Sequence, residues 1–232
     1  MNKKTIQSIF LGMVLLLMYL PILILAVYSF MDSAIIGKSG SFTVKNYVYL
    51  FHSEDLRSMI FGTLILAVVV AVISTILGTL GAIGAFYSSK KLKRPIHLMN
   101  QIPVVNADVV TGFSICVLLI VFFKMDKASY IPLVIGLVSL CSPFVYLSVI
   151  PRLKQMDPQL YEAALDLGCS PFGALRKVVL PQLTSGIVSG FMMSITLTLD
   201  DYFITTYTKP SMFDTISTYV VNATKGAQTD VK

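Results

Sequence analysis

Long uncharged tracts alternate with short charged segments along the whole chain. Five of these tracts can supply the roughly 20 apolar residues that a membrane-spanning helix needs. The expected spans cover about residues 8–31, 58–87, 97–123, 130–150 and 182–207. The pattern therefore predicts an all-α, polytopic helical membrane protein whose residues 1–232 form a single transmembrane domain.

The second and third tracts carry residues that are unusual for a span facing lipid. In the second tract Ser74, Gly78 and Ala82 recur at intervals of four, which favours close approach of a neighbouring helix. The third tract reads NQIPVVNADVVTG and includes Pro103 and Asp108. Such residues are typical of a kinked or broken helix that borders protein or water rather than lipid.

Composition and charge agree with a membrane protein. Apolar residues make up 55% of the chain, charged residues make up 13%, and the mean hydropathy is +0.78. The net charge of +6 comes from basic residues at the membrane edges, so it predicts orientation rather than nucleic-acid binding. The segments on the side of the N-terminus are the more positive, which predicts a cytoplasmic N-terminus. We interpret Cys116, Cys141 and Cys169 as small apolar residues and expect no metal site.

The chain becomes polar after Lys209. Five spans would leave its C-terminus on the side opposite to the N-terminus. We therefore expect that a sixth span is missing from the C-terminus of this sequence.

A charged segment at residues 152–181 separates the fourth and fifth spans and has the signals of a helical hairpin. Asp157-Pro158 and Ser170-Pro171 both begin helices, because the polar side chain can cap free N–H groups and proline fits the first turn. Gly168 suits the left-handed residue that ends the first helix. Two interpretations remain open: an amphipathic hairpin on the bilayer surface, or a rigid projection through which a moving partner transmits force.

Three acidic residues fall inside predicted spans: Asp108, Asp200 and Asp201. A carboxylate near the bilayer centre costs about 3 kcal/mol on insertion scales, so these side chains must meet water, a partner or a cation, or be protonated. With the neighbouring Tyr202 they could line a pathway for an organic polycation. The alternative is that they hydrogen-bond between helices.

The hairpin resembles the EAA loop of ABC importer permeases. That pattern is Glu-Ala-Ala, three residues, Gly, nine residues, an aliphatic residue, one further residue, and Leu-Pro. The matching positions here are Glu162, Ala163, Ala164, Gly168, Val178, Leu180 and Pro181, with Val178 where Ile is usual. The resemblance implies the type I ABC importer permease fold, with six spans in permeases of this size.

The resemblance also implies partners. In this family the hairpin docks on a cytoplasmic ATP-binding subunit, and Glu162 helps to fix it there. The expected assembly has a dimer of ATP-binding subunits, a second homologous permease and an extracytoplasmic substrate-binding protein. The permease itself is expected to contact the lipid of a bacterial inner membrane. ATP and Mg²⁺ would bind the partner ATPase, so we expect no cofactor and no catalytic residue in this chain.

Two shorter motifs indicate the substrate. PVVNADVV and TLDDYFIT resemble segments of spermidine/putrescine importer permeases, specifically of the second permease of the pair, at Asp108 and at Asp200-Asp201. Ala107 replaces the proline expected before Asp108. The resemblance implies a polyamine importer; the alternatives are a permease for another small solute, an intramembrane aspartyl enzyme and a passive cation channel.

Overall fold

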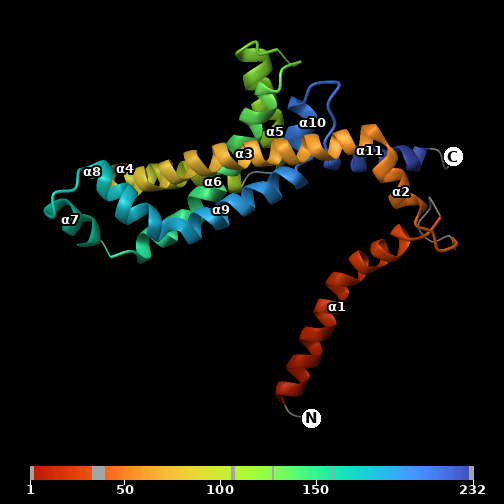
Figure 1. The fold of residues 1–232 in the computed structure, drawn as a ribbon, viewed down its shortest axis with the longest axis horizontal. Helices are drawn as coiled ribbons and strands as arrows, with labels where there is room; N and C mark the ends of the chain where they lie inside the picture. The colour runs from red at the N-terminus through yellow and green to blue at the C-terminus, as the bar shows by residue number, and fades with distance from the viewer. Residues whose placement is uncertain (1–2, 33–39, 106–107, 127, 158, 230–232) are drawn as a thin grey trace. The chain divides into compact units, whose positions relative to one another are not determined.

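The computed structural model describes residues 3–32, 40–105, 108–126, 128–157 and 159–229. These ranges are helical apart from turns and an isolated bridge between Met31 and Phe42, which confirms the all-α class (Figure 1). The chain divides into two compact units, Met1–Ser58 and Met59–Lys232.

The first unit contains the long apolar helix α1 (Lys3–Ser29) and the short helix α2 (Lys45–His52). The aromatic ring of Phe30 lies between those of Phe42 and Tyr47, at centroid distances of 5.7 and 5.1 Å. The Ser29 hydroxyl is hydrogen-bonded to the Tyr47 hydroxyl at 2.7 Å. These contacts hold α2 against the end of α1, in the region between the first two predicted spans.

The second unit is arranged around three long helices that lie side by side, α3, α6 and α9 (Figure 1). Helices α7 and α8 lie at one end of this group, and α10 and α11 follow the other end of α9. The helices are α3 (Glu54–Tyr87, which begins just before the unit boundary), α4 (Lys90–Val105), α5 (Asp108–Cys116), α6 (Ile131–Gln155), α7 (Gln159–Asp166), α8 (Pro171–Ala174), α9 (Leu180–Asp200), α10 (Phe203–Thr208) and α11 (Ile216–Thr229), with π-helical segments η1 (Val117–Phe122) and η2 (Leu175–Val179).

Helix α6 is the centre of this group, and glycines let its neighbours approach it closely. A Cβ atom on Gly78 of α3 would lie 2.6 Å from Val145 Cβ, and one on Gly190 of α9 would lie 3.1 Å from Val145 Cα. A Cβ atom on Gly186 would lie 3.0 Å from the carbonyl oxygen of Ser148. The close approach predicted from the spacing of Ser74, Gly78 and Ala82 is confirmed at Gly78.

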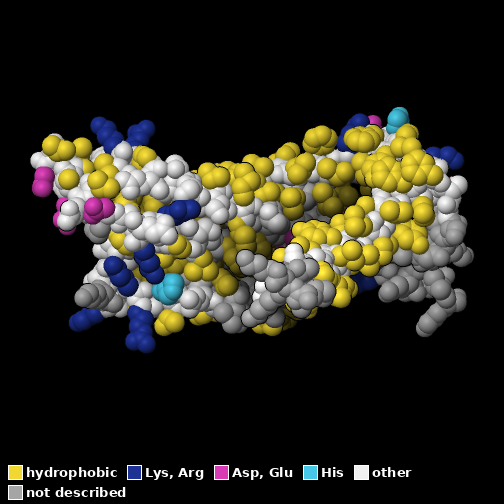
Figure 2. Space-filling view, turned by 90° about the horizontal axis from the view of Figure 1, so that it is seen from below, with side chains coloured by type: hydrophobic (Ala, Val, Ile, Leu, Met, Phe, Trp, Pro, Cys, Tyr) yellow, Lys and Arg dark blue, Asp and Glu magenta, His cyan; other side chains and the backbone are white. Residues whose placement is uncertain are grey.

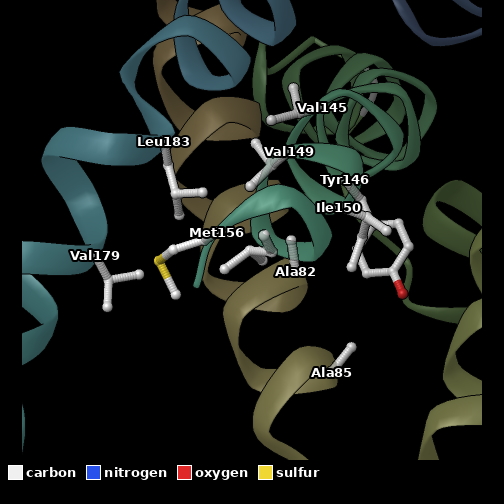
Figure 3. Close-up of a cluster of buried hydrophobic side chains, with 10 residues drawn as sticks. Ala82, Ala85, Val145, Tyr146, Val149, Ile150, Met156, Val179 and Leu183 are labelled. Atoms are coloured by element: carbon white, nitrogen blue, oxygen red, sulfur yellow. The ribbon is translucent and has the colours of Figure 1, made fainter. Parts of the chain in front are cut away.

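Buried side chains of the three long helices form a continuous apolar cluster toward the end that carries α7 and α8. Figure 3 shows Val145 and Val149 of α6 in one cluster with Leu183 of α9 and Ala82 of α3. Val179, from the π-helical segment η2, joins the same cluster and is fully buried. The packing therefore connects the membrane-spanning helices to the second arm of the hairpin.

The helix lengths differ from the predicted spans in two places. Among the residues that the structure describes, four helical segments are long and apolar enough to cross a membrane: Gln7–Ser29, Glu54–Tyr87, Ile131–Gln155 and Pro171–Asp200. The predicted span 97–123 instead corresponds to the end of α4 and to a shorter apolar helix, Val109–Phe122, on either side of residues 106–107, which lie outside the described residues. The predicted span 182–207 is interrupted after Asp200, where α9 ends and the separate helix α10 follows.

Candidate functional site

The hairpin turn has the backbone geometry that its sequence predicts. The Asp157 carboxylate accepts a hydrogen bond from the Gln159 N–H at 2.9 Å and so caps the start of α7. Gly168 ends α7 with a φ of +84°, in the left-handed region. Its N–H donates to the Leu165 carbonyl at 2.9 Å, and the Cys169 N–H donates to the Ala164 carbonyl at 3.0 Å. This pair of bonds is the Schellman arrangement, and it confirms the role predicted for Gly168.

The second arm of the hairpin continues directly into the membrane. The Ser170 hydroxyl accepts a hydrogen bond from the Gly173 N–H at 3.2 Å, and Pro171 occupies the first turn. Pro181 has no N–H to bond the preceding turn, and here the helix widens: the Leu180 N–H donates to the Leu175 carbonyl, five residues back. Helical structure nevertheless runs from Pro171 to Asp200, a length of about 45 Å at 1.5 Å per residue.

One face of the hairpin packs on the body of the unit, and the other is exposed. Ala164 is buried, and the ring of Tyr161 lies 5.0 Å from that of Tyr87 at the end of α3. Glu162 and Ala163, in contrast, are exposed. The hairpin therefore presents part of the EAA motif to its surroundings and uses another part to anchor itself.

Two large apolar side chains beside the turn are among the most exposed in the unit, although the sequence analysis did not select them. Leu167 is 86% exposed and Phe172 is 75% exposed. Their places in the sequence, shortly before and after the turn residue Gly168, could have identified them. Figure 2 shows that Lys, Arg, Asp and Glu side chains also gather at this end of the unit, whereas much of the adjoining surface is hydrophobic. Exposed apolar residues within a charged surface are typical of a protein docking site.

The C-terminal end of α9 has a different construction, centred on Asp201. The backbone of Asp201 is extended, with a ψ of 121°, and so ends α9. Its carboxylate accepts hydrogen bonds from both the N–H and the hydroxyl of Thr205, each at 2.8 Å. Asp201 is itself buried. This carboxylate therefore stabilises the first turn of α10, which is the physical reason for the break that the sequence analysis missed.

Helix α10 packs between α5 and α6 through Ile204, which is fully buried. A Cβ atom on Gly112 of α5 would lie 3.1 Å from the Ile204 backbone, and one on Gly136 of α6 would lie 2.8 Å from the Ile204 side chain. Asp108 is the first residue of α5, but its side chain lies outside the described residues. The fold thus brings the helix that begins at Asp108 against the helix that follows Asp201.

Asp200 and Tyr202 lie on either side of Asp201 and are less buried than it is. Asp200 is exposed, and its carbonyl oxygen accepts a hydrogen bond from the Ser217 hydroxyl of α11 at 3.2 Å. The Lys225 ammonium, also from α11, lies 5.0 Å from the centre of the Tyr202 ring and donates to the Tyr202 hydroxyl at 3.0 Å. The ring face of Tyr202 is therefore suited to an ammonium group and is occupied by that of Lys225. In the described part of the chain no cluster of His, Cys, Asp or Glu could hold a metal ion.

Comparison with known proteins identifies the family. Residues 77–230 match the family described as binding-protein-dependent transport system inner membrane component. The chain is 32% identical over 196 residues to the spermidine/putrescine transport system permease protein PotC of Escherichia coli (strain K12), covering 84% of this chain and 73% of that protein. It is 30% identical over 202 residues to the putrescine transport system permease protein PotI of the same strain, covering 82% and 69%.

A third relative, the PotC protein of Haemophilus influenzae, is 28% identical over 207 residues, covering 89% of this chain and 80% of that protein. The resemblance drawn from the hairpin and the Asp motifs is thereby confirmed. Members of this family are multi-pass membrane subunits that work with an ATPase and a binding protein, and they are transport components rather than enzymes. The chain therefore belongs to the family of inner membrane components of binding-protein-dependent transport systems, as a permease subunit.

Proposed function

We propose that this permease subunit imports polyamines, spermidine or putrescine, in an ATP-driven transporter of a bacterial inner membrane. The observation that carries the substrate class is the similarity to polyamine permeases over more than four-fifths of the chain. The exposed Asp200 supplies an anionic group for an organic polyamine, and the Tyr202 ring supplies an aromatic one when an amine of the polyamine displaces the Lys225 ammonium.

The proposed assembly contains this chain, a second homologous permease, a dimer of ATP-binding subunits and an extracytoplasmic binding protein. ATP and Mg²⁺ bind only the ATPase. The exposed side of the hairpin, with Glu162, Leu167 and Phe172, docks on that ATPase. Helical structure joins Pro171 to Asp200, so movement of the docked hairpin shifts the outer end of α9 and alternates access to the substrate.

The proposed orientation places the N-terminus and the hairpin in the cytoplasm. It follows from the basic residues around the hairpin and the α3–α4 connection. Cys169 in the hairpin turn provides a test in a Cys116→Ser/Cys141→Ser background. After removal of the ATP-binding subunit from the membranes, a membrane-impermeant maleimide should label Cys169 in inside-out vesicles and leave it unlabelled in intact cells. The opposite result would reverse the orientation.

Uptake by the complete transporter tests the substrate. Cells expressing all subunits should accumulate labelled putrescine or spermidine and not a neutral solute of similar size. Asp200→Asn should reduce uptake about tenfold, because it removes an exposed carboxylate next to the aromatic site, while the subunits still co-purify. Exposed Asp126 offers a matched control, and Asp126→Asn should leave uptake unchanged. Transport of the neutral solute alone would assign the permease to another substrate class.

A further inference from the structure

A cavity of about 460 Å³ opens between α3, α4 and α6, near the end of the unit that carries the hairpin. Its lining combines two kinds of side chain. The buried part is Ala85, Tyr146 and Ile150, each less than a tenth exposed. Figure 3 shows Tyr146 and Ile150 extending from α6 on the side away from Val179 and Leu183. The cavity is therefore separate from the packing between α6 and α9.

Basic side chains surround this apolar floor. Lys93 and Arg94 of α4 and Lys154 of α6 line the cavity and are exposed, and His97 lies one turn after Lys93. The Lys93 ammonium lies 5.2 Å from the centre of the Phe86 ring, which places it at the cavity wall. No Asp or Glu is among the lining residues. Over the described ranges the one ion pair joins Lys209 to Asp214, so none of these three cations is neutralised by a described carboxylate.

We propose that this cavity binds the phosphate headgroup of an anionic phospholipid. The three cations can pair with a phosphodiester, and the apolar floor suits the glycerol and the first acyl carbons that follow it. Lys154 comes at the end of an apolar span, which puts the basic rim at the level of lipid headgroups. A cationic rim repels polyamines, so the cavity is distinct from the substrate route. Basic residues that only set the orientation of the protein in the membrane would not require a cavity with a buried apolar floor.

The test uses the complete transporter in detergent, titrated with phosphatidylglycerol and followed by native mass spectrometry. Lys93→Gln/Lys154→Gln should weaken binding about 30-fold, which corresponds to about 1 kcal/mol for each basic residue at a membrane surface. The matched control is Lys91→Gln/Arg152→Gln, which removes the same charge from the same two helices at exposed residues outside the cavity lining. The control should bind phosphatidylglycerol like the wild type, and Lys93→Arg/Lys154→Arg should also retain it.

Two further ligands distinguish the source of the phosphate. Phosphatidylcholine should bind at least tenfold more weakly, because its net charge is zero. Glycerol 3-phosphate at the same concentration should not compete, because it lacks the acyl chains that contact the floor. Equal loss of binding in the control variant would overturn the proposed site, as would equal binding of phosphatidylcholine. Effective competition by glycerol 3-phosphate would exclude the lipid as its ligand.

Discussion

The two ends of the helical segment that runs from Pro171 to Asp200 are stabilised in different ways. At the hairpin end, local backbone signals fix the turn and leave Glu162, Leu167 and Phe172 exposed. At the other end the turn depends on a buried carboxylate, that of Asp201, and on helices from other parts of the chain. The hairpin end therefore leaves large side chains open to its surroundings, whereas the break after Asp200 is part of the fold itself.

The largest effect should come from the buried carboxylate. Asp201→Ala removes two hydrogen bonds to Thr205 and leaves the Thr205 N–H without its partner, so the free energy of unfolding should fall by about 3 kcal/mol. Asp200→Ala, one residue away and exposed, should change it by less than about 0.5 kcal/mol. Denaturant unfolding of both variants in the same detergent measures the difference. Equal destabilisation would remove the distinction between a structural Asp201 and an accessible Asp200.

A smaller effect is expected at the hairpin turn. Gly168→Ala places a side chain at a φ of +84°, which costs about 1 kcal/mol, although no atom lies within 4 Å of the added Cβ. Amide hydrogen exchange in α7 should therefore rise about fivefold. Gly81→Ala is the control, because that glycine is helical and its Cβ position is also open. If amide hydrogen exchange in α7 stayed unchanged in Gly168→Ala, the left-handed backbone at Gly168 would not be what stabilises the turn.

The smallest effect should follow loss of the exposed cation near the C-terminal end of α9. Lys225→Gln removes the contact with the Tyr202 ring, which contributes about 0.5 kcal/mol in an exposed position. Hydrogen exchange near the C-terminal end of α11 should rise about twofold, and exchange in α7 should not change. A similar rise in α7 would mean that the two ends are more tightly linked than the packing indicates.

These contrasts explain which features the sequence could predict. The hairpin depends on short-range signals, so Asp157, Gly168 and the Ser170-Pro171 pair were sufficient to place it. The break after Asp200 depends on burial of Asp201 and on the insertion of Ile204 between α5 and α6, which no local pattern encodes. The adjacent acids Asp200 and Asp201 in an otherwise apolar tract indicated a polar feature at this point. The sequence did not show which of the two carboxylates is buried.

Two helices were missed for a related reason. Helix α2 is short and has no buried residue among its side chains, and its position depends on aromatic contacts with the end of α1. Helix α11 is amphipathic and polar, and its start is fixed by distant partners, including a hydrogen bond from the Ile216 N–H to the Thr63 hydroxyl at 3.2 Å. Hydrophobic length, which identified the apolar tracts, carries no information about such segments.

Crosslinking from one phenylalanine position at each end of the Pro171–Asp200 segment tests the central claim most directly. Phe172 of the hairpin and Phe203 after the break at Asp201 are both exposed phenylalanines, so the added benzoyl group of the photoreactive analogue benzoylphenylalanine can extend into the surroundings at either position. In the complete transporter, illumination should link position 172 to the ATP-binding subunit and leave position 203 without that product. A crosslink to the ATP-binding subunit from position 203, or none from position 172, would contradict the account.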